Sequence, residues 1–289
     1  MGGTVFSAVA PKTGSLLMLI SPQELFARLG TAVILDASWH MPDSGRDAAA
    51  EFEAGHIPGA RRFDIDAISD PSSPLPHTLP SPEAFAESVG ALGISRDKEV
   101  VVYEAGAPFS APRAWWMLTI MGHPATMLLD GGLARWRAEG FPIETGAAAP
   151  ATPARFEPAF DPALLADADM VENWLANGGT VVDVRSAERF AGRAPEPRPG
   201  IRAGHMPGAK NLHYAQLVDE SGRMKSDAAL RAAVEDAGVD LSRPVIASCG
   251  SGVTAAILAL ALTRLGTPAR VYDGSWTEWG GDPNRTVVT

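Results

Sequence analysis

The chain alternates short apolar runs, which predict buried strands, with amphipathic stretches, which predict helices. In the first half, strands are predicted at 32–36, 99–104 and up to residue 129, and helices at 21–29, 48–54, 81–92, 112–121 and around Trp136. Ser21-Pro22-Gln23-Glu24 combines an N-cap, a first-turn proline and an acidic residue that complements the helix dipole. Because strands and helices alternate, we expect an α/β fold with a mostly parallel sheet.

The second half repeats this order, with a helix predicted at 169–177, a strand at 180–184 and a turn at 204–209 that matches the turn at 55–60. Three pairs of landmarks recur at similar offsets: His56 and His205 (205 − 56 = 149), Asp36 and Asp183 (183 − 36 = 147), and Asp130 and Asp273 (273 − 130 = 143). One order at nearly one offset predicts two homologous domains. Each is expected to have a mostly parallel central sheet with helices on both faces.

The segment 147–162 is dense in alanine and proline, which is typical of a linker. We therefore expect a first domain at 1–146 and a second at 163–289. At 289 residues, two domains of ordinary size are the default expectation.

The formal net charge of −10 and the pI near 5.1 argue against nucleic acid or an anionic membrane as the main partner. A single cysteine excludes an intramolecular disulfide and a cysteine-rich metal site, and it suits a reducing compartment, so we expect a cytoplasmic protein. Residues 1–20 lack a convincing signal peptide, and Phe6 stands where a myristoylation pattern needs Ser or Thr. No apolar stretch approaches the length of a membrane helix.

The cysteine lies at the most informative point of the chain. A buried strand is predicted to end at Cys249, a loop with Gly250 and Gly252 follows, and a helix is predicted over 255–265. Backbone N–H groups in such a loop and at the helix N-terminus favour a thiolate over a thiol. This pattern predicts a cysteine nucleophile, against the general alternative of an inert buried cysteine.

The repeat supplies an internal control. Alignment of the two halves puts Glu104 opposite Cys249, at an offset of 249 − 104 = 145, so the first copy lacks the nucleophile. The loop at 105–110 is bulkier, and we expect it to pack against the other domain more than to cradle an anion. One active domain and one supporting domain are predicted.

These residues resemble the tandem-rhodanese sulfurtransferases, from Ile34 through Trp279. The most specific stretches are Cys249-Gly250-Ser251-Gly252-Val253-Thr254, residues 183–209 and residues 272–280. The resemblance implies that a Cys249 persulfide carries sulfur from a small-molecule donor to a thiol acceptor, such as thioredoxin or a low-molecular-weight thiol, or to cyanide. It implies no metal and no organic cofactor.

The two residues after the cysteine separate branches of this family. Branches that prefer thiosulfate typically carry basic residues there, whereas Gly250 and Ser251 are neutral. The resemblance therefore implies 3-mercaptopyruvate as the donor, with thiosulfate as the alternative. Arg189 and Arg198 match the positions that hold the carboxylate and keto oxygen of this substrate, and Gly250, Gly252, Val253 and Thr254 form the loop around its sulfur.

The resemblance also implies a relay of Ser251, His77 and Asp66, in which the histidine comes from the inactive domain. Such a relay would place the active site at the domain interface and give a proton to the departing enolate. The alternative is that Ser251 is simply a small residue in a tight loop. Both interpretations remain open at the level of sequence.

Two rival functions also fit a cysteine in such a loop, and two further histidines are candidate catalytic groups. A cysteine phosphatase needs an arginine where this chain has Ala255, so that chemistry is disfavoured. A non-enzymatic sulfur carrier, loaded and unloaded by partners at Cys249, remains an alternative. His56 and His205 occupy equivalent turns in both copies, including the copy without a cysteine, which favours a structural role.

Overall fold

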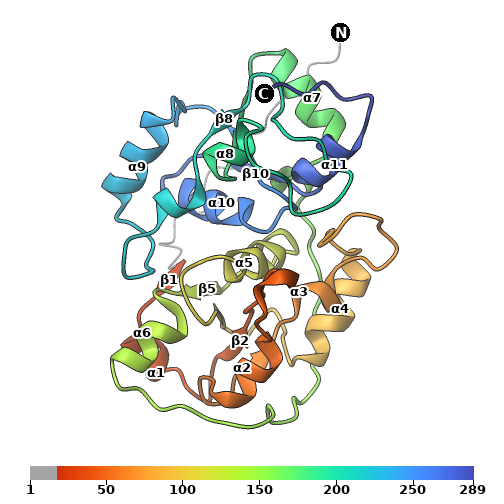
Figure 1. Cartoon of the computed structure of the whole chain (residues 1–289). Coiled ribbons are helices and arrows are strands. Elements are labelled where there is room, and N and C mark those ends of the chain that lie inside the picture. Colours follow the sequence, from red (N-terminus) through yellow and green to blue (C-terminus); the bar gives the residue numbers. More distant parts are fainter. Residues whose placement is uncertain (1–17) are drawn as a thin grey trace.

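The computed structural model describes residues 18–289 and contains two five-stranded sheets, one in each half of the chain (Figure 1). The order β1-β5-β4-β2-β3 in the first sheet recurs as β6-β10-β9-β7-β8 in the second, and all neighbouring strands are parallel. The strands are β1 Leu19–Ile20, β2 Val33–Asp36, β3 Arg61–Arg62, β4 Val100–Tyr103, β5 Thr126–Leu129, β6 Leu165–Ala166, β7 Thr180–Asp183, β8 Lys210–Asn211, β9 Val245–Ser248 and β10 Ala269–Tyr272. The predicted duplicated α/β fold is confirmed.

Helices cover both faces of each sheet. In the first half they are α1 Pro22–Phe26, α2 Ala48–Ala54, α3 Ile65–Ile68, α4 Pro82–Ala91, α5 Ala111–Ile120 and α6 Gly132–Ala138. In the second half they are α7 Ala168–Ala176, α8 Ala187–Phe190, α9 Asp227–Asp236, α10 Ala255–Arg264 and α11 Ser275–Gly281. Short 3₁₀ turns lie at Pro42–Ser44, Pro162–Leu164 and Tyr214–Leu217.

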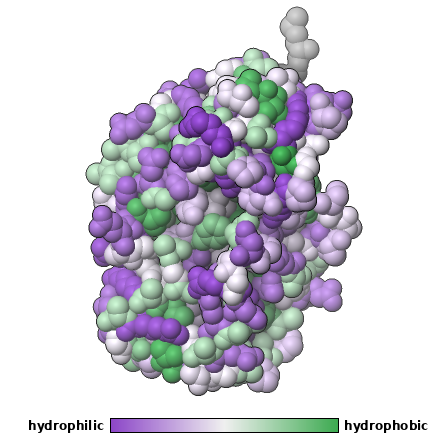
Figure 2. All heavy atoms as spheres, in the orientation of Figure 1, coloured by the Kyte–Doolittle hydropathy of each residue, from purple (hydrophilic) through white to green (hydrophobic). Residues whose placement is uncertain are grey.

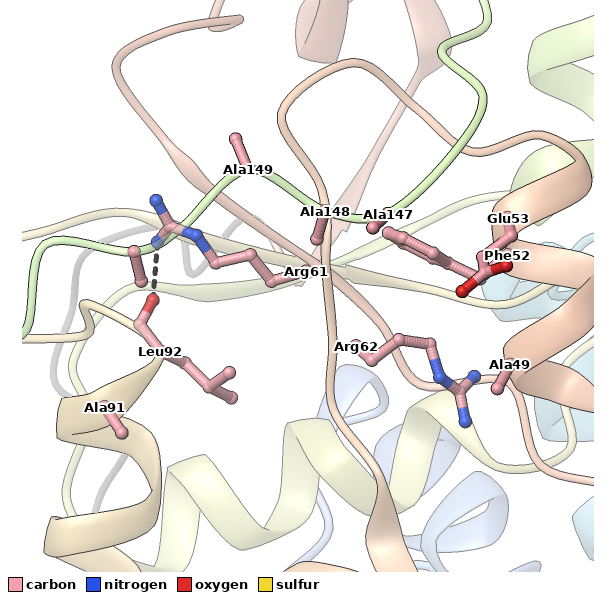
Figure 3. Close-up of a pocket in the computed structure, with 11 residues that line it drawn as sticks. Ala49, Phe52, Glu53, Arg61, Arg62, Ala91, Leu92, Ala147, Ala148 and Ala149 are labelled. Atoms are coloured by element: carbon pink, nitrogen blue, oxygen red, sulfur yellow. Dashed lines mark hydrogen bonds between the residues drawn. The ribbon is translucent and has the colours of Figure 1, made fainter.

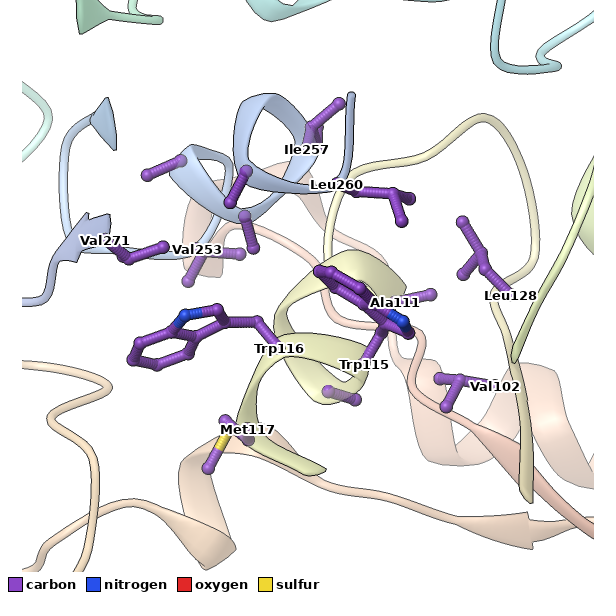
Figure 4. Close-up of a cluster of buried hydrophobic side chains, with 14 of the residues drawn as sticks. Val102, Ala111, Trp115, Trp116, Met117, Leu128, Val253, Ile257, Leu260 and Val271 are labelled. Carbon is purple, nitrogen blue, oxygen red and sulfur yellow. The ribbon is translucent and has the colours of Figure 1, made fainter. Parts of the chain in front are cut away.

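Alternate residues of the central strands face two different cores. Val33 and Leu35 of β2 face a core shared by both domains, whereas Ile34 between them faces an outer core of the first domain. Helices α5 and α10 lie between the two sheets, and Figure 4 shows Trp115 and Trp116 of α5 in one apolar cluster with Ile257 and Leu260 of α10. The domains therefore meet through a continuous apolar core.

The predicted linker packs along the first domain. The amide of Ala154 donates to the carbonyl of Gly90 at 2.9 Å, and the amide of Ala159 donates to that of Met121 at 2.9 Å. Phe156 is buried and packs edge-on against Phe85. The segment thus adds to the first domain's core; the boundaries expected at 146 and 163 stay a prediction.

Several elements were not predicted. They are the short edge strands β1, β3, β6 and β8 and the helices α3, α8 and α9. Two-residue strands are too short to show an alternating pattern, which explains why these four strands were missed. The expectations about a signal peptide and a lipid anchor concern residues that lie mostly outside the described part of the chain, which begins at residue 18.

The outer surface mixes hydrophilic and apolar side chains on the face seen in Figure 2. Within residues 18–289, no helix combines the length and the apolar character that a bilayer crossing requires.

Candidate active site

Cys249 directly follows β9 and precedes α10, as the sequence predicts. Only 2% of its surface is exposed. The hydroxyl oxygen of Ser275 lies 3.9 Å from its sulfur and accepts a hydrogen bond from its amide at 3.1 Å. The amide of Trp276 donates to the carbonyl of Cys249 at 3.0 Å. The start of α11 therefore fixes the backbone of the cysteine and sets a hydroxyl beside its sulfur.

The loop after the cysteine offers unoccupied backbone donors. The amides of residues 250–254 donate to no acceptor within the part of the chain that the structure describes. Gly252 has a φ of 75°, and a β-carbon there would lie 2.6 Å from the carbonyl oxygen of Asp273. Only glycine fits this position. Free N–H groups in a tight loop before a helix form an arrangement that favours an anion.

The structure brings Ser251, His77 and Asp66 together across the domain interface. The Nδ1 atom of His77 lies 3.0 Å from Oγ of Ser251, and its Nε2 atom lies 3.0 Å from a carboxylate oxygen of Asp66. The hydrogen bond from His77, with a second one from Trp39 at 2.7 Å, lowers the pKa of Asp66. His77 is buried, whereas the side chain of Asp66 is 58% exposed. The three residues thus form one hydrogen-bonded chain that ends two positions after Cys249.

Two residues of this site have an unusual backbone. His77 and Ser275 have φ of 59° and 50°, and no other non-glycine residue in 18–289 has a positive φ. Counted from the N-caps Ser81 and Ser226, the equivalent of His77 is Gly222. Counted from the aspartates that follow β5 and β10, the equivalent of Ser275 is Gly132.

Both equivalents are glycines with positive φ, 77° at Gly222 and 56° at Gly132. In each pair one copy thus uses glycine, for which this conformation is unstrained, whereas the other copy places a side chain there at a cost: His77 in the supporting copy and Ser275 in the cysteine copy. The role of Ser275 was not predicted. The signal was available in the repeat, where a serine stands opposite a glycine.

The two arginines predicted to bind substrate differ in their partners. Arg189 donates to Glu196 at 2.5 Å, and a β-carbon on Gly250 would lie 3.2 Å from its guanidinium. Arg198 makes no hydrogen bond or ion pair with any residue in 18–289. Burial lowers the pKa of Arg198, while the nearby charges of Cys249 and Asp66 oppose this. Two cations therefore lie near the sulfur: Arg189, which is ion-paired with Glu196, and Arg198, which has no hydrogen bond or ion pair within residues 18–289.

Glu196 was not predicted, and it organises this side of the site. Its side chain is 4% exposed and accepts from Arg185 at 2.7 Å as well as from Arg189. Arg185 in turn pairs with the buried Asp183 at 2.6 Å and lies over the ring of Trp276. The network explains how a charged carboxylate is tolerated inside the protein.

The equivalent position in the first domain already holds an anion, which corrects the expectation that its loop would not cradle one. The carboxylate of Glu104 accepts hydrogen bonds from the amides of Phe109, Ser110 and Ala111 at 2.8, 3.0 and 3.1 Å. Burial raises the pKa of Glu104 to about 7 in spite of these bonds. The expected packing also occurs, because Phe109 contacts Tyr214 of the second domain.

His56 and His205 have matching surroundings. Each Nδ1 atom lies 2.8 Å from a backbone carbonyl oxygen, that of Phe52 or that of Phe190. Each imidazole stacks on the ring of the same phenylalanine, with centroids 3.8 Å apart. Equal contacts in both copies agree with the structural role predicted for them.

Two cavities lie among the described residues of the first domain and the predicted linker, 18–162. One, of about 340 Å³, is bounded by α2, Arg61, Arg62 and residues 147–149 of the predicted linker (Figure 3). The other, of about 240 Å³, is lined by Trp39, Glu104 and Phe109 beside the first copy's loop. Within residues 18–289, no group of three or more His, Cys, Asp or Glu side chains is arranged to hold a metal ion.

Comparison with known proteins agrees with this geometry. The rhodanese-like domain family matches residues 21–139 and again residues 167–282. Human 3-mercaptopyruvate sulfurtransferase is 46% identical over 250 residues, which are 85% of this chain and 84% of the human protein. A mitochondrial thiosulfate/3-mercaptopyruvate sulfurtransferase of Arabidopsis thaliana is 43% identical over 276 residues, 88% of this chain and 73% of the plant protein.

A solved structure shows the same likeness. The crystal structure of SseA from Escherichia coli, described as a 3-mercaptopyruvate sulfotransferase with the rhodanese fold, superimposes with a TM-score of 0.82 at 40% identity. The match covers 90% of this chain and 98% of SseA. Two matches to one domain family, relatives above 40% identity and a shared fold lead to one conclusion: the chain belongs to the rhodanese family and carries two copies of its domain.

Proposed function

We propose that this protein is a sulfurtransferase that moves sulfur from 3-mercaptopyruvate to a thiol acceptor or to cyanide and releases pyruvate. The observation that carries this proposal is the contact between His77 and Ser251, because Ser251 lies only two positions after Cys249 in the sequence. Loss of sulfur from 3-mercaptopyruvate leaves an enolate that needs a proton, whereas thiosulfate leaves as sulfite and needs none. A proton relay beside the cysteine therefore fits the first donor.

In the first half-reaction, the Cys249 thiolate attacks the sulfur of the donor. An S–S bond forms, the C–S bond breaks, and its electron pair leaves with the enolate of pyruvate. Ser251 gives the enolate its proton and is reprotonated through His77, whose other nitrogen is held by Asp66. Arg198 and Arg189 hold the carboxylate and keto oxygen of the donor. The backbone amides of residues 250–254 stabilise the anionic sulfur. Four residues of this loop contact the substrate: Gly250, Gly252, Val253 and Thr254.

In the second half-reaction, the acceptor thiolate or cyanide attacks the outer sulfur of the Cys249 persulfide. The S–S bond breaks and the Cys249 thiolate is regenerated, so the cycle needs no oxidant. Thioredoxin or a low-molecular-weight thiol is the acceptor class we propose. We place the reaction in the cytoplasm because the single cysteine suits a reducing compartment, although the Arabidopsis relative is named as mitochondrial.

Two assays on the purified protein test the proposal: pyruvate released from 3-mercaptopyruvate and sulfite released from thiosulfate, each with cyanide as acceptor. We expect a clear preference for 3-mercaptopyruvate in kcat/KM. Cys249→Ser should abolish both activities while the thermal midpoint of unfolding stays near that of the wild type. A preference for thiosulfate would contradict the assignment of the donor, and pyruvate release by Cys249→Ser would contradict the nucleophile.

Two alternatives give different results. A thiosulfate-specific enzyme would show the reverse order of the two activities. A non-enzymatic sulfur carrier would release pyruvate or sulfite at most once per protein molecule, because it depends on partners for unloading. Multiple turnovers with small-molecule donor and acceptor alone would identify an enzyme.

A further inference from the structure

Arg113 of α5 is a fully buried arginine located behind the candidate active site. Its guanidinium donates to the carbonyl of His77 at 2.6 Å and to the carbonyl of Gly252 at 3.4 Å, and it pairs with the carboxylate of Asp273 at 2.6 Å. Its charge also lies over the ring of Trp116, 4.4 Å from the centroid. One side chain thus joins the strained histidine, the cysteine loop and the turn after β10.

The carboxylate of Asp273 grips the same segment from a second point. Its other oxygen accepts a hydrogen bond from the amide of Leu79 at 2.7 Å. The backbone on both sides of residue 78 is therefore held by one ion pair. Because His77 has a φ of 59°, which costs energy for a residue with a side chain, its conformation persists only if surrounding contacts enforce it.

The other half of the molecule shows that docking of the domains does not require this arginine. There the carboxylate of Asp130 accepts from the amide of Met224 at 3.1 Å, which repeats the contact between Asp273 and Leu79. Counted from the helix N-caps, however, the equivalent of Arg113 is the apolar Ile257. The buried arginine occurs only on the side where the facing turn carries a histidine.

Burial of a guanidinium is expensive unless its charge and donors are satisfied. An apolar residue in α10 serves the same packing position without that cost. The difference between Arg113 and Ile257 therefore indicates that the active site, and not the packing of the domains, requires the arginine.

We propose that Arg113 is a positioning residue for the proton relay. It holds the left-handed backbone of His77 and the carbonyl of Gly252, and thereby keeps Nδ1 of His77 within hydrogen-bonding distance of Ser251. The inference rests on the relay role of His77 stated above. Its effect falls on the step in which pyruvate is protonated and leaves; transfer of the outer sulfur from a persulfide that has already formed does not need the relay.

The test separates these two steps in Arg113→Met, Arg113→Lys, His77→Ala and the double variant Arg113→Met/His77→Ala. Pyruvate release is followed in a single turnover, and sulfur transfer from the preloaded persulfide to cyanide is followed separately. We expect Arg113→Met to slow pyruvate release at least roughly tenfold, to leave transfer to cyanide near the wild-type rate, and to be partly rescued by lysine. The double variant should be no slower than His77→Ala, because both changes disable one unit.

Arg61→Met is the matched control, because Arg61 also donates to a backbone carbonyl of the first domain but faces the cavity of Figure 3. It should leave both steps unchanged. If Arg113→Met does not fold, Asp273→Asn removes the partner charge and is expected to slow the same step. A slow His77→Ala beside a normal Arg113→Met and Asp273→Asn would overturn the role of Arg113 alone. An unchanged His77→Ala would overturn the relay and, with it, the role of Arg113.

Discussion

The imidazole of His77 and the hydroxyl of Ser251 are 3.0 Å apart although the residues are 174 positions apart and belong to different domains. Neither domain alone contains a complete relay, so the geometry of the interface sets the geometry of the site. Since the domains share one apolar core, changes at the interface should affect the chemistry as well as stability.

Removal of the relay should affect one step of the reaction. We expect Ser251→Ala to slow pyruvate release by roughly 10²- to 10⁴-fold, the usual contribution of general acid catalysis. Rapid-quench measurement of pyruvate gives the rate, and Ser242→Ala on the surface is the control. Equal rates in the wild type and Ser251→Ala would show that the serine is only a small loop residue.

Gly250 and Gly252 lie in the same loop, but replacement by alanine should affect the protein differently at the two positions. Gly250 does not have a positive φ, and its new β-carbon would meet only the end of the Arg189 side chain. We expect Gly250→Ala to fold and to raise KM for 3-mercaptopyruvate by roughly tenfold or less.

Gly252→Ala is the companion variant. Its β-carbon would meet the backbone of Asp273 at 2.6 Å in a left-handed conformation, so it should lower the free energy of unfolding by about 2 kcal/mol or more. Urea titrations of both variants distinguish the two effects. Equal stability of the two would contradict the difference in their surroundings.

Arg198 should contribute mainly to substrate binding. It has no partner within residues 18–289, so an anionic donor gains its hydrogen bonds without breaking others. We expect Arg198→Ala to raise KM for 3-mercaptopyruvate roughly 10- to 100-fold, as hydrogen bonds to charged groups contribute about 1.5–3 kcal/mol. Steady-state kinetics provide the measurement, and the exposed Arg155→Ala in the predicted linker provides the control. An unchanged KM would exclude contact with the substrate.

The buried carboxylate of Glu104 should make stability depend on pH. Its pKa in the folded protein is about 7, above the ordinary 4.5, so between these values the folded protein binds the proton more tightly than the unfolded chain does. The stability of the wild type relative to Glu104→Ala should therefore fall as pH rises through this window, by at most roughly 3 kcal/mol. Urea unfolding of both proteins across the window gives the difference; a constant difference would contradict the raised pKa.

The sequence was sufficient for the fold because the repeat and the strand–helix alternation are local patterns. The loop at Cys249 was also predictable, since glycines and a buried strand surround it. The contacts of Arg113, Glu196 and Trp39 were not, because each depends on segments that meet only after folding. Comparison of the two copies could have indicated two further site residues, because His77 and Ser275 each align with a glycine of the other copy.

The position of Glu104 bears on how many sulfur atoms one chain can carry. Both copies retain a strand, a tight loop and a helix, but the carboxylate of Glu104 already saturates the amides of its own loop. A covalently attached side chain thus occupies the position where an anionic substrate would bind in the first copy, and it cannot dissociate. A donor molecule consequently has one productive place to bind, and we expect each chain to be loaded with one sulfur atom rather than two.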